Sequence, residues 1–237
     1  MIRYRAGTLP SASNRRPFSI EYFLEAGTRV AERRFGSGGL IFSPGDTGKQ
    51  LYFLLEGTVR LYRIYGHHKE ATVALLKEGD VFGELDLEAK TCQSVFAEAI
   101  AASRVAVVRK PALEEAIRRH PEFAIELFSA FSERLRQSDE KVEVLLNRGV
   151  ATRIAALLWH LADRFGEPDA SGMALRLRLT HQDLANMVAS TREAVSKVMS
   201  EFQRGGLIAV RGRRIVVSPR LAEAYPGNLP SIPGAAA

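Results

Sequence analysis

The stretch that most constrains this chain runs from Leu179 to Val217 and reads LTHQDLANMVASTREAVSKVMSEFQRGGLIAVRGRRIVV. Its pattern predicts a short helix, a tight turn, a second helix and, after a glycine pair, a two-stranded basic wing. Thr180 and Asp183 place a hydroxyl and a carboxylate in the first turn, so the first helix is expected to begin there. Ser190 or Thr191 is expected to cap the second helix. Together these features predict a winged helix-turn-helix.

In the second helix, apolar residues recur at spacings of three and four, which predicts one buried face and one exposed face. The buried face is predicted to hold Val195, Val198, Met199 and Phe202, and the exposed face Arg192, Glu193, Ser196 and Lys197. An arginine can donate two hydrogen bonds to guanine and a glutamate can accept one from cytosine, so this exposed face suits the major groove of DNA. The alternative is an ordinary solvated face that carries an i, i+4 pair of glutamate and lysine.

Local charge favours the DNA interpretation. Residues 180–220 contain seven Lys/Arg against three Asp/Glu, and an arginine-rich wing suits contacts with phosphates. We therefore expect double-stranded DNA as the partner. The residues expected to contact it are Thr180, Ser190, Thr191, Arg192, Glu193, Ser196, Lys197, Arg211, Arg213 and Arg214.

Length and composition limit the remaining classes. The chain has 237 residues, 46% of them apolar, which is enough for about two domains, and its formal net charge of +6 favours an anionic partner. Cys92 is the single cysteine, so an internal disulfide and a multi-cysteine metal site within one chain are excluded, and we expect no metal and no cofactor. No apolar run approaches the ~20 residues of a membrane span, so we expect no membrane partner and a cytoplasmic location.

The N-terminal half is predicted to be a β domain. Residues 1–18 are expected to form a flexible arm, and a short helix is expected between Ile20 and Arg34. Within residues 19–120, short apolar runs alternate with turn signals such as Pro44-Gly45-Asp46 at a spacing of about ten residues. This pattern predicts an antiparallel sandwich or barrel, here a jelly roll, and an α+β fold for the whole chain.

A long helix is predicted over residues 121–147, after a short helix that ends at His120-Pro121. Apolar side chains recur in it at heptad spacing, which predicts a seam for a parallel homodimer, although a helix that packs on the core would also carry apolar residues. The residues of this predicted seam are Phe128, Phe131, Leu135, Val142 and Leu145.

The winged helix-turn-helix domain is expected over residues 148–220, after a hinge at 147–150. The segment ATRIAALLWHLADRFG is predicted to be an amphipathic helix with Leu158 and Trp159 buried. A polar loop is expected from Glu167 to Gly172, a strand in LRLRL before Thr180, and an unstructured tail over residues 221–237.

The motifs PGD, YFLLEG, FGEL, RLRQSDEKV, TRIAALL and TREAVSKVM closely resemble those of the CRP/FNR family of bacterial transcription regulators, over roughly Phe35 to Val217. The segments IFSPGD, LYFLLEGTVRLYRIY, ATVALLKEGDVFGEL and LTHQDLA are most similar to the NtcA-type nitrogen regulators. This resemblance implies a cyclic-nucleotide-binding jelly roll, a dimerising helix and a C-terminal DNA-binding domain. It also implies homodimers that bind palindromic promoter sites and usually recruit RNA polymerase, so we expect an activator.

The resemblance also implies a site sequence. Arg192, Glu193 and Lys197 match the three positions with which cyclic-AMP receptor proteins read a TGTGA-type half-site, with lysine for the usual arginine at the last. FNR-type proteins instead have a glutamate and a Ser-Arg pair, matched by Glu193 and Ser196-Lys197, and read a TTGAT-type site. We expect the TGTGA-like site because Arg192 is present.

The effector pocket implied by the resemblance is altered. Gly83, Glu84 and Leu85 match the Gly-Glu-Leu segment of the cyclic-AMP phosphate cradle, but Gln93 precedes Ser94 where the family has an arginine. Loss of that charge-assisted pair removes about 1.5 to 3 kcal/mol. We therefore expect a different effector or none.

The comparison with the nitrogen regulators leads to the same expectation. Those proteins bind 2-oxoglutarate with an arginine at the position of Val95, whereas Arg134 and Asp139 match their polar pair on the long helix. Ser138 lies where cyclic-AMP binders place a hydroxyl against the purine. The alternatives are a regulator that does respond to cyclic AMP or 2-oxoglutarate, and a ligand-sensing module that does not bind DNA. An enzyme is disfavoured because no nucleophile with a base and no metal-ligand set accompanies the carboxylates near Glu84.

Overall fold

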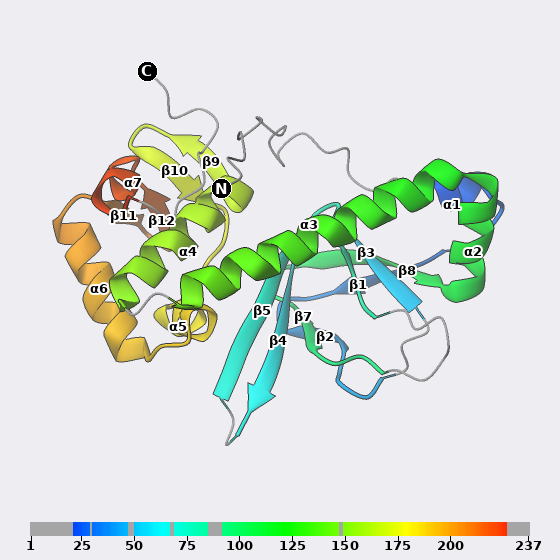
Figure 1. The fold of residues 1–237 in the computed structure, drawn as a ribbon, viewed down its shortest axis with the longest axis horizontal. Helices are drawn as coiled ribbons and strands as arrows, with labels where there is room; N and C mark the ends of the chain where they lie inside the picture. Colours follow the sequence, from blue (N-terminus) through cyan, green and yellow to red (C-terminus); the bar gives the residue numbers. More distant parts are fainter. Residues whose placement is uncertain are drawn as a thin grey trace, which may run out of the picture.

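The computed structural model describes residues 21–28, 30–46, 50–66, 69–84, 92–146 and 149–226. An N-terminal β domain and a C-terminal domain are joined by the long helix α3 (Pro121–Leu146), which runs past the sandwich to the first helix of the C-terminal domain (Figure 1). The predicted α+β architecture with a long helix between two domains is confirmed. The predicted arm (1–18) and residues 227–237 of the predicted tail lie outside the described residues.

The N-terminal domain contains two four-stranded antiparallel sheets, ordered β1-β8-β3-β6 and β2-β7-β4-β5. Their strands are β1 (Ala31–Phe35), β2 (Gly39–Phe42), β3 (Gln50–Glu56), β4 (Thr58–Tyr65), β5 (Lys69–Lys77), β6 (Val81–Phe82), β7 (Phe96–Ala99) and β8 (Ser103–Arg109). Between the sheets, the rings of Phe42, Tyr52 and Phe82 pack with centroids 5.0 to 6.0 Å apart. The predicted domain of short antiparallel strands is thus confirmed.

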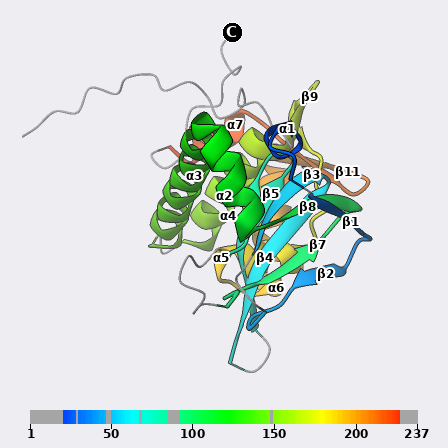
Figure 2. The same ribbon diagram turned by 90° about the vertical axis from the view of Figure 1, so that its right-hand side faces the viewer.

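Three helices flank the sandwich: α1 (Glu21–Glu25), α2 (Lys110–Arg119) and the N-terminal end of α3. Figure 2 shows α2 and α3 on one side of the strands. The Phe23 ring contacts the rings of Phe53 and Phe123 edge-on, at 5.5 and 5.2 Å between centroids, so these helices are held on the sheet by a cluster of their own. The predicted helix between Ile20 and Arg34 is shorter than expected, because residues 31–35 pair with β8.

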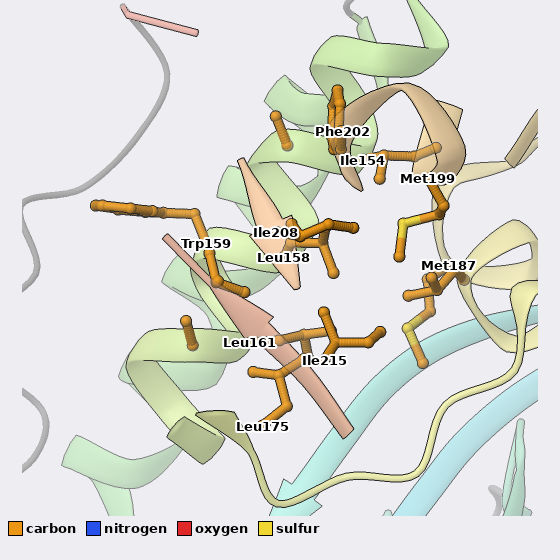
Figure 3. Packing of buried hydrophobic residues seen from close by; sticks show 14 of the residues in the cluster. Ile154, Leu158, Trp159, Leu161, Leu175, Met187, Met199, Phe202, Ile208 and Ile215 are labelled. Carbon is orange, nitrogen blue, oxygen red and sulfur yellow. The ribbon is translucent and has the colours of Figure 1, made fainter. Parts of the chain in front are cut away.

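The C-terminal domain packs helices around a small sheet ordered β11-β12-β10-β9. Its elements are α4 (Val150–Phe165), β9 (Gly166–Asp169), β10 (Gly172–Leu175), α5 (His181–Val188), α6 (Arg192–Arg204), β11 (Ile208–Arg211), β12 (Arg214–Val217) and α7 (Arg220–Ala224). Figure 3 shows Ile154 and Leu158 of α4 beside Met199 and Phe202 of α6 in one apolar core. Leu158 and Trp159 are buried, as predicted.

Three expectations for this domain are wrong. The predicted loop at 167–172 is a hairpin, and the strand predicted in LRLRL instead spans residues 172–175, because β10 pairs with both β9 and β12. The tail is predicted to lack structure from residue 221, but residues 221–224 belong to helix α7. Leu221 is completely buried, and the centroid of the Tyr225 ring lies 5.3 Å from that of the Phe202 ring. Apolar contacts with the core therefore extend the domain to its last described residues.

The C-terminal domain docks on the edge strand β5 of the N-terminal domain. Leu75 of β5, 7% exposed, belongs to the apolar core of the C-terminal domain. Arg164 of α4 forms an ion pair with Asp80 at 2.7 Å and a hydrogen bond with Gln137 of α3 at 2.7 Å. The ammonium of Lys77 donates to the Arg164 carbonyl at 3.2 Å. We call this region, where β5, α3, α4 and α5 meet, the interdomain joint.

Candidate nucleic-acid interface

Both helices of the helix-turn-helix begin at the predicted caps. The backbone N–H of Asp183 donates to the Thr180 hydroxyl at 3.1 Å, and the N–H of Thr180 donates to the Asp183 carboxylate at 2.7 Å. Helix α5 ends at Ala189, whose φ of 50° turns the chain toward α6. Thr191, rather than Ser190, caps α6, because its hydroxyl accepts the N–H of Ala194 at 3.3 Å. The caps therefore fix where the exposed end of α6 begins.

Helix α6 presents the predicted buried face, and on the predicted exposed face Ser196 is half-buried whereas the other three residues are exposed. Val195, Val198, Met199 and Phe202 are buried. Arg192, Glu193 and Lys197 are exposed on the opposite side, the first two in the first turn of the helix. An arginine and a glutamate exposed at a helix N-terminus have the donors and acceptors needed to read guanine and cytosine in a major groove. Thr180 and Thr191 are exposed at the caps, and Ser190 is half-buried between them.

Ser196 has a structural contact that the sequence did not reveal. Its hydroxyl lies 2.8 Å from Nδ1 of His181 and donates to the Arg192 carbonyl at 2.8 Å. This link fixes α5 against α6 and holds the exposed turn of α6 in place.

The wing is the β11–β12 hairpin, which turns at Gly212 with φ of 63°. Arg213 and Arg214 are exposed there and suit phosphate contacts. Arg211 is also exposed, but its guanidinium contacts both oxygens of Asp169 at 3.0 Å and the Ser171 hydroxyl at 3.2 Å. The N–H and hydroxyl of Ser171, with Arg211 beside them, hold the pKa of Asp169 below its usual value. Asp169, which the sequence did not single out, therefore ties the wing to the β9–β10 hairpin.

Helix α3 carries an apolar stripe in the predicted seam. Phe128 is 74% exposed and Leu135 65%, and Phe131 and Val142 are exposed as well. Leu145 is half-buried. Ile125 and Leu146, which the heptad pattern did not include, are also exposed and lengthen the stripe. Large apolar side chains exposed along a helix form a surface suited to burial against a second copy of the chain.

The predicted phosphate cradle is closed by Gln93, which is 2% exposed. Its side-chain amide accepts from the Glu84 N–H at 3.0 Å and donates to the Glu84 carbonyl at 3.3 Å. Gly83 has φ of 97°, and a Cβ there would lie 2.8 Å from the Tyr52 ring, so glycine is required beside the cradle. Gln93 thus binds the backbone of the Gly-Glu segment where the resemblance predicts a phosphate.

A polar chain continues from the cradle to β4. The Ser94 hydroxyl donates to the Glu84 carboxylate and accepts from the Arg63 guanidinium at 2.9 Å. Arg63 is a cation at the cradle that sequence reasoning missed, because it reaches Ser94 only through the β4–β7 pairing. The predicted Leu85 lies outside the described residues.

Among the described residues, the predicted effector residues of α3 form no hydrogen bond with Glu84, Gln93 or Ser94 of this cradle. Arg134 donates to the Val81 carbonyl at 3.2 Å, and burial lowers its pKa although Asp80 and Glu84 oppose the shift. Ser138 and Asp139 are exposed. The structure thus brings Glu84, Gln93 and Ser94 together, with Arg134 close enough to interact electrostatically with Glu84.

No group of three or more His, Cys, Asp or Glu side chains in the described part of the chain is placed to hold a metal ion. No described helix is both long and apolar enough to cross a membrane.

Comparison with known families covers both domains. The model of the Crp-like helix-turn-helix domain matches residues 152–222, and that of the cyclic nucleotide-binding domain matches residues 32–120. These spans coincide with the C-terminal domain and with the sandwich and α2. The resemblance inferred from the motifs is therefore confirmed for both halves of the chain.

Three known proteins illustrate the similarity. The chain is 34% identical over 185 residues, 77% of its length and 82% of the relative's, to a global nitrogen regulator of Synechocystis sp. (strain ATCC 27184 / PCC 6803 / Kazusa). It is 28% identical over 184 residues, 78% of its length and 82% of the relative's, to a CRP-like cAMP-activated global transcriptional regulator of Mycobacterium tuberculosis (strain ATCC 25618 / H37Rv). The structure of FixK2 from Bradyrhizobium japonicum shares the fold, with a TM-score of 0.71 and 24% identity over 88% of this chain and 100% of that one. The predicted similarity to nitrogen regulators is thus confirmed.

Proposed function

This chain is a member of the CRP/FNR family of DNA-binding transcriptional regulators, and on that premise we propose that it binds a palindromic promoter site with TGTGA-like half-sites as a homodimer and activates transcription through RNA polymerase. The observation that carries the proposal is the exposed pair Arg192 and Glu193 in the first turn of α6, with Lys197 one turn later. The role is regulatory and not enzymatic, in line with the names of the relatives.

Each exposed group has a defined role in this proposal. The Arg192 guanidinium donates two hydrogen bonds to O6 and N7 of a guanine, and the Glu193 carboxylate accepts one from a cytosine N4 amine. Lys197 reaches a second guanine or a phosphate. Arg213 and Arg214 of the wing bind phosphates without regard to sequence, as do the N–H groups at the caps Thr180, Ser190 and Thr191.

Dimerisation explains why the proposed DNA site is palindromic. The apolar stripe of α3 packs against the same stripe of a second copy, so the two α6 helices enter successive major grooves about 34 Å apart. Exposure of Phe128, Leu135 and Val142 supports this pairing, since a monomer would leave them in water.

The effector is proposed to be altered or lost. Gln93 occupies the cradle with two hydrogen bonds to the Glu84 backbone and carries no charge to offset that of a phosphate. A response to cyclic AMP, as the name of the mycobacterial relative describes for that protein, is the second candidate, because the Arg63 guanidinium at Ser94 offers a cation. Without an effector, the DNA-binding arrangement is already populated and protein abundance sets the response.

Fluorescence anisotropy at fixed salt tests the base-reading claim. The wild-type protein is titrated onto a TGTGA-N6-TCACA duplex and a scrambled duplex, with and without cyclic AMP or 2-oxoglutarate. We expect selective binding that neither ligand changes. Arg192→Ala should cost about 1 to 3 kcal/mol on the palindrome, about 5- to 150-fold in Kd, and relax the choice of one base pair.

Two variants control for charge. Arg204→Ala removes an arginine from the last turn of the same helix and should leave selectivity unchanged. Arg213→Ala should weaken binding to both duplexes alike, because it removes a phosphate contact. An equal loss on both duplexes for Arg192→Ala would contradict base reading, and selective binding only with one ligand would contradict the altered effector.

A further inference from the structure

A cavity of about 440 Å³ lies inside the interdomain joint. Its walls come from β5 of the N-terminal domain, from α3, and from α4 and α5 of the C-terminal domain. The volume is within the range of about 300 to 1,000 Å³ that is typical of small-molecule sites. Any molecule in this cavity contacts both domains at once.

The cavity is separate from the phosphate cradle. Gly83, Glu84, Gln93 and Ser94 do not line it, and of the predicted effector residues that the structure describes only Arg134 and Ser138 do. The cradle lies at the Gly-Glu segment after β6, whereas the cavity extends from β5 toward α4 and α5. The docking of the C-terminal domain on β5 therefore creates this space.

Most of the wall is apolar. The side chains that supply this part include Val73 and Leu75 of β5, Leu157 and Leu161 of α4, and Met187 and Val188 of α5. Such a lining favours a ligand with an apolar body, because about 25 cal/mol is gained for each Å² of apolar surface removed from water.

One part of the wall carries polar groups that lack suitable partners. The Lys141 ammonium donates to the carbonyls of Thr72 and, at 3.2 Å, Val73, and no carboxylate of a described residue lies within 4.0 Å of it. The Thr72 hydroxyl is buried and has no hydrogen-bond partner within the described ranges. Neither ring nitrogen of His160, which also lines the cavity, forms a hydrogen bond among the described residues.

The charged side chains that line the cavity are not all paired with one another in the described part of the chain. Arg164 is paired with Asp80, and Glu140 is paired with Arg136. Glu143 supplies a second carboxylate to the lining. Among the described residues, Lys141 bonds to carbonyls alone, and the Arg134 guanidinium bonds to the carbonyl of Val81 while Asp80 and Glu84 interact with it electrostatically. Neither of these lining cations is bonded to a described carboxylate, and an anion supplied from outside would complement them.

We propose that the cavity binds a small organic anion with an apolar body, of the medium-chain monocarboxylate class. The carboxylate accepts hydrogen bonds from Lys141, and the hydrocarbon chain packs on Leu75, Leu161 and Met187. Because the ligand contacts β5 and α5 together, it stabilises the docked arrangement of the two domains. Any effect of this ligand on DNA binding rests on the proposed function as a DNA-binding regulator. The binding of the ligand to the cavity does not depend on that function.

Isothermal titration calorimetry of the full chain with octanoate and octanamide at pH 7 tests the proposal. The two probes share an apolar body and differ in charge. We expect saturable binding of octanoate, with octanamide at least tenfold weaker. Lys141→Gln should weaken octanoate at least tenfold and abolish the preference, whereas Lys69→Gln, on the same strand but outside the cavity, should change neither.

A second variant tests location without removing a charge. Val73 is 39% exposed on a β-strand, so Val73→Trp is compatible with folding and fills part of the cavity. Both probes should then lose at least tenfold in affinity, with the circular dichroism spectrum unchanged. Absence of saturable octanoate binding, equal binding of octanoate and octanamide, or full binding by folded Val73→Trp would overturn the proposal. DNA binding measured in parallel separates the two proposals, because either can fail while the other holds.

Discussion

His160 should make the folded protein sensitive to acid. The imidazole lies on α4 in the interdomain joint, and burial, reinforced by Arg164 and Arg136, lowers its pKa from the ordinary 6.5 to about 4. Glu133 opposes this shift and Lys141 adds to it, so burial and three cations outweigh one carboxylate. At neutral pH the folded protein therefore holds this imidazole uncharged.

The sign and size of the effect follow from linkage. Between pH 6.5 and pH 4 the unfolded chain binds a proton at this histidine that the folded chain does not, so the free energy of unfolding falls as pH falls. The loss is below about 0.5 kcal/mol above pH 6.5 and amounts to about 3 kcal/mol at pH 4, since a difference of one in pKa corresponds to about 1.4 kcal/mol.

Urea unfolding followed by far-UV circular dichroism at pH 7, 6, 5 and 4 measures this quantity. Other groups titrate in the same range, so the informative value is the free energy of unfolding of wild type minus that of His160→Gln. This difference should fall by about 3 kcal/mol from pH 7 to pH 4 at one protein concentration. A difference that stays constant over this range would refute the reasoning and place the imidazole in contact with water.

Three further predictions concern the helices. Leu135→Asp puts a charge into the apolar stripe of α3 and should shift the protein from dimer to monomer in analytical ultracentrifugation, whereas Gln137→Asp on another face should not; an unchanged dimer would place the interface elsewhere. Thr180→Ala removes the cap of α5 and should lower the free energy of unfolding by about 1 kcal/mol in urea titrations, with Thr180→Ser retaining it. Phe202→Ala opens a cavity in the C-terminal core and should cost about 3 to 5 kcal/mol in the same assay; a cost below about 1 kcal/mol would mean that the core refills.

The parts of the fold predicted correctly depend on short-range signals. Thr180 and Asp183 cap α5 within a single turn, and the apolar spacing through Phe202 assigns the buried face of α6. Heptad spacing in α3 likewise identified side chains that the structure leaves exposed. Such signals lie within a few residues of each other, so a sequence displays them directly.

The parts that were missed depend on contacts between distant residues. The segment at 31–35 became a strand because β8, seventy residues away, pairs with it. Arg63 reaches Ser94, and Asp169 reaches Arg211, only after sheets bring them together. The ion pair of Arg164 with Asp80 joins two domains. At such positions, contacts between residues distant in the sequence override the local secondary-structure preference. The local sequence pattern does not indicate these contacts.

Leu75 shows that the apolar core of the C-terminal domain includes a residue from outside the sequence range of that domain. It belongs to the β strand of one domain and to the apolar core of the other. A fragment that begins at Gly149 would leave behind part of its own core and expose apolar surface on α5 to water. An exchange of DNA-binding domains between relatives should therefore transfer the residue at position 75 together with the domain. This residue is far from the domain in the sequence but packs in its core.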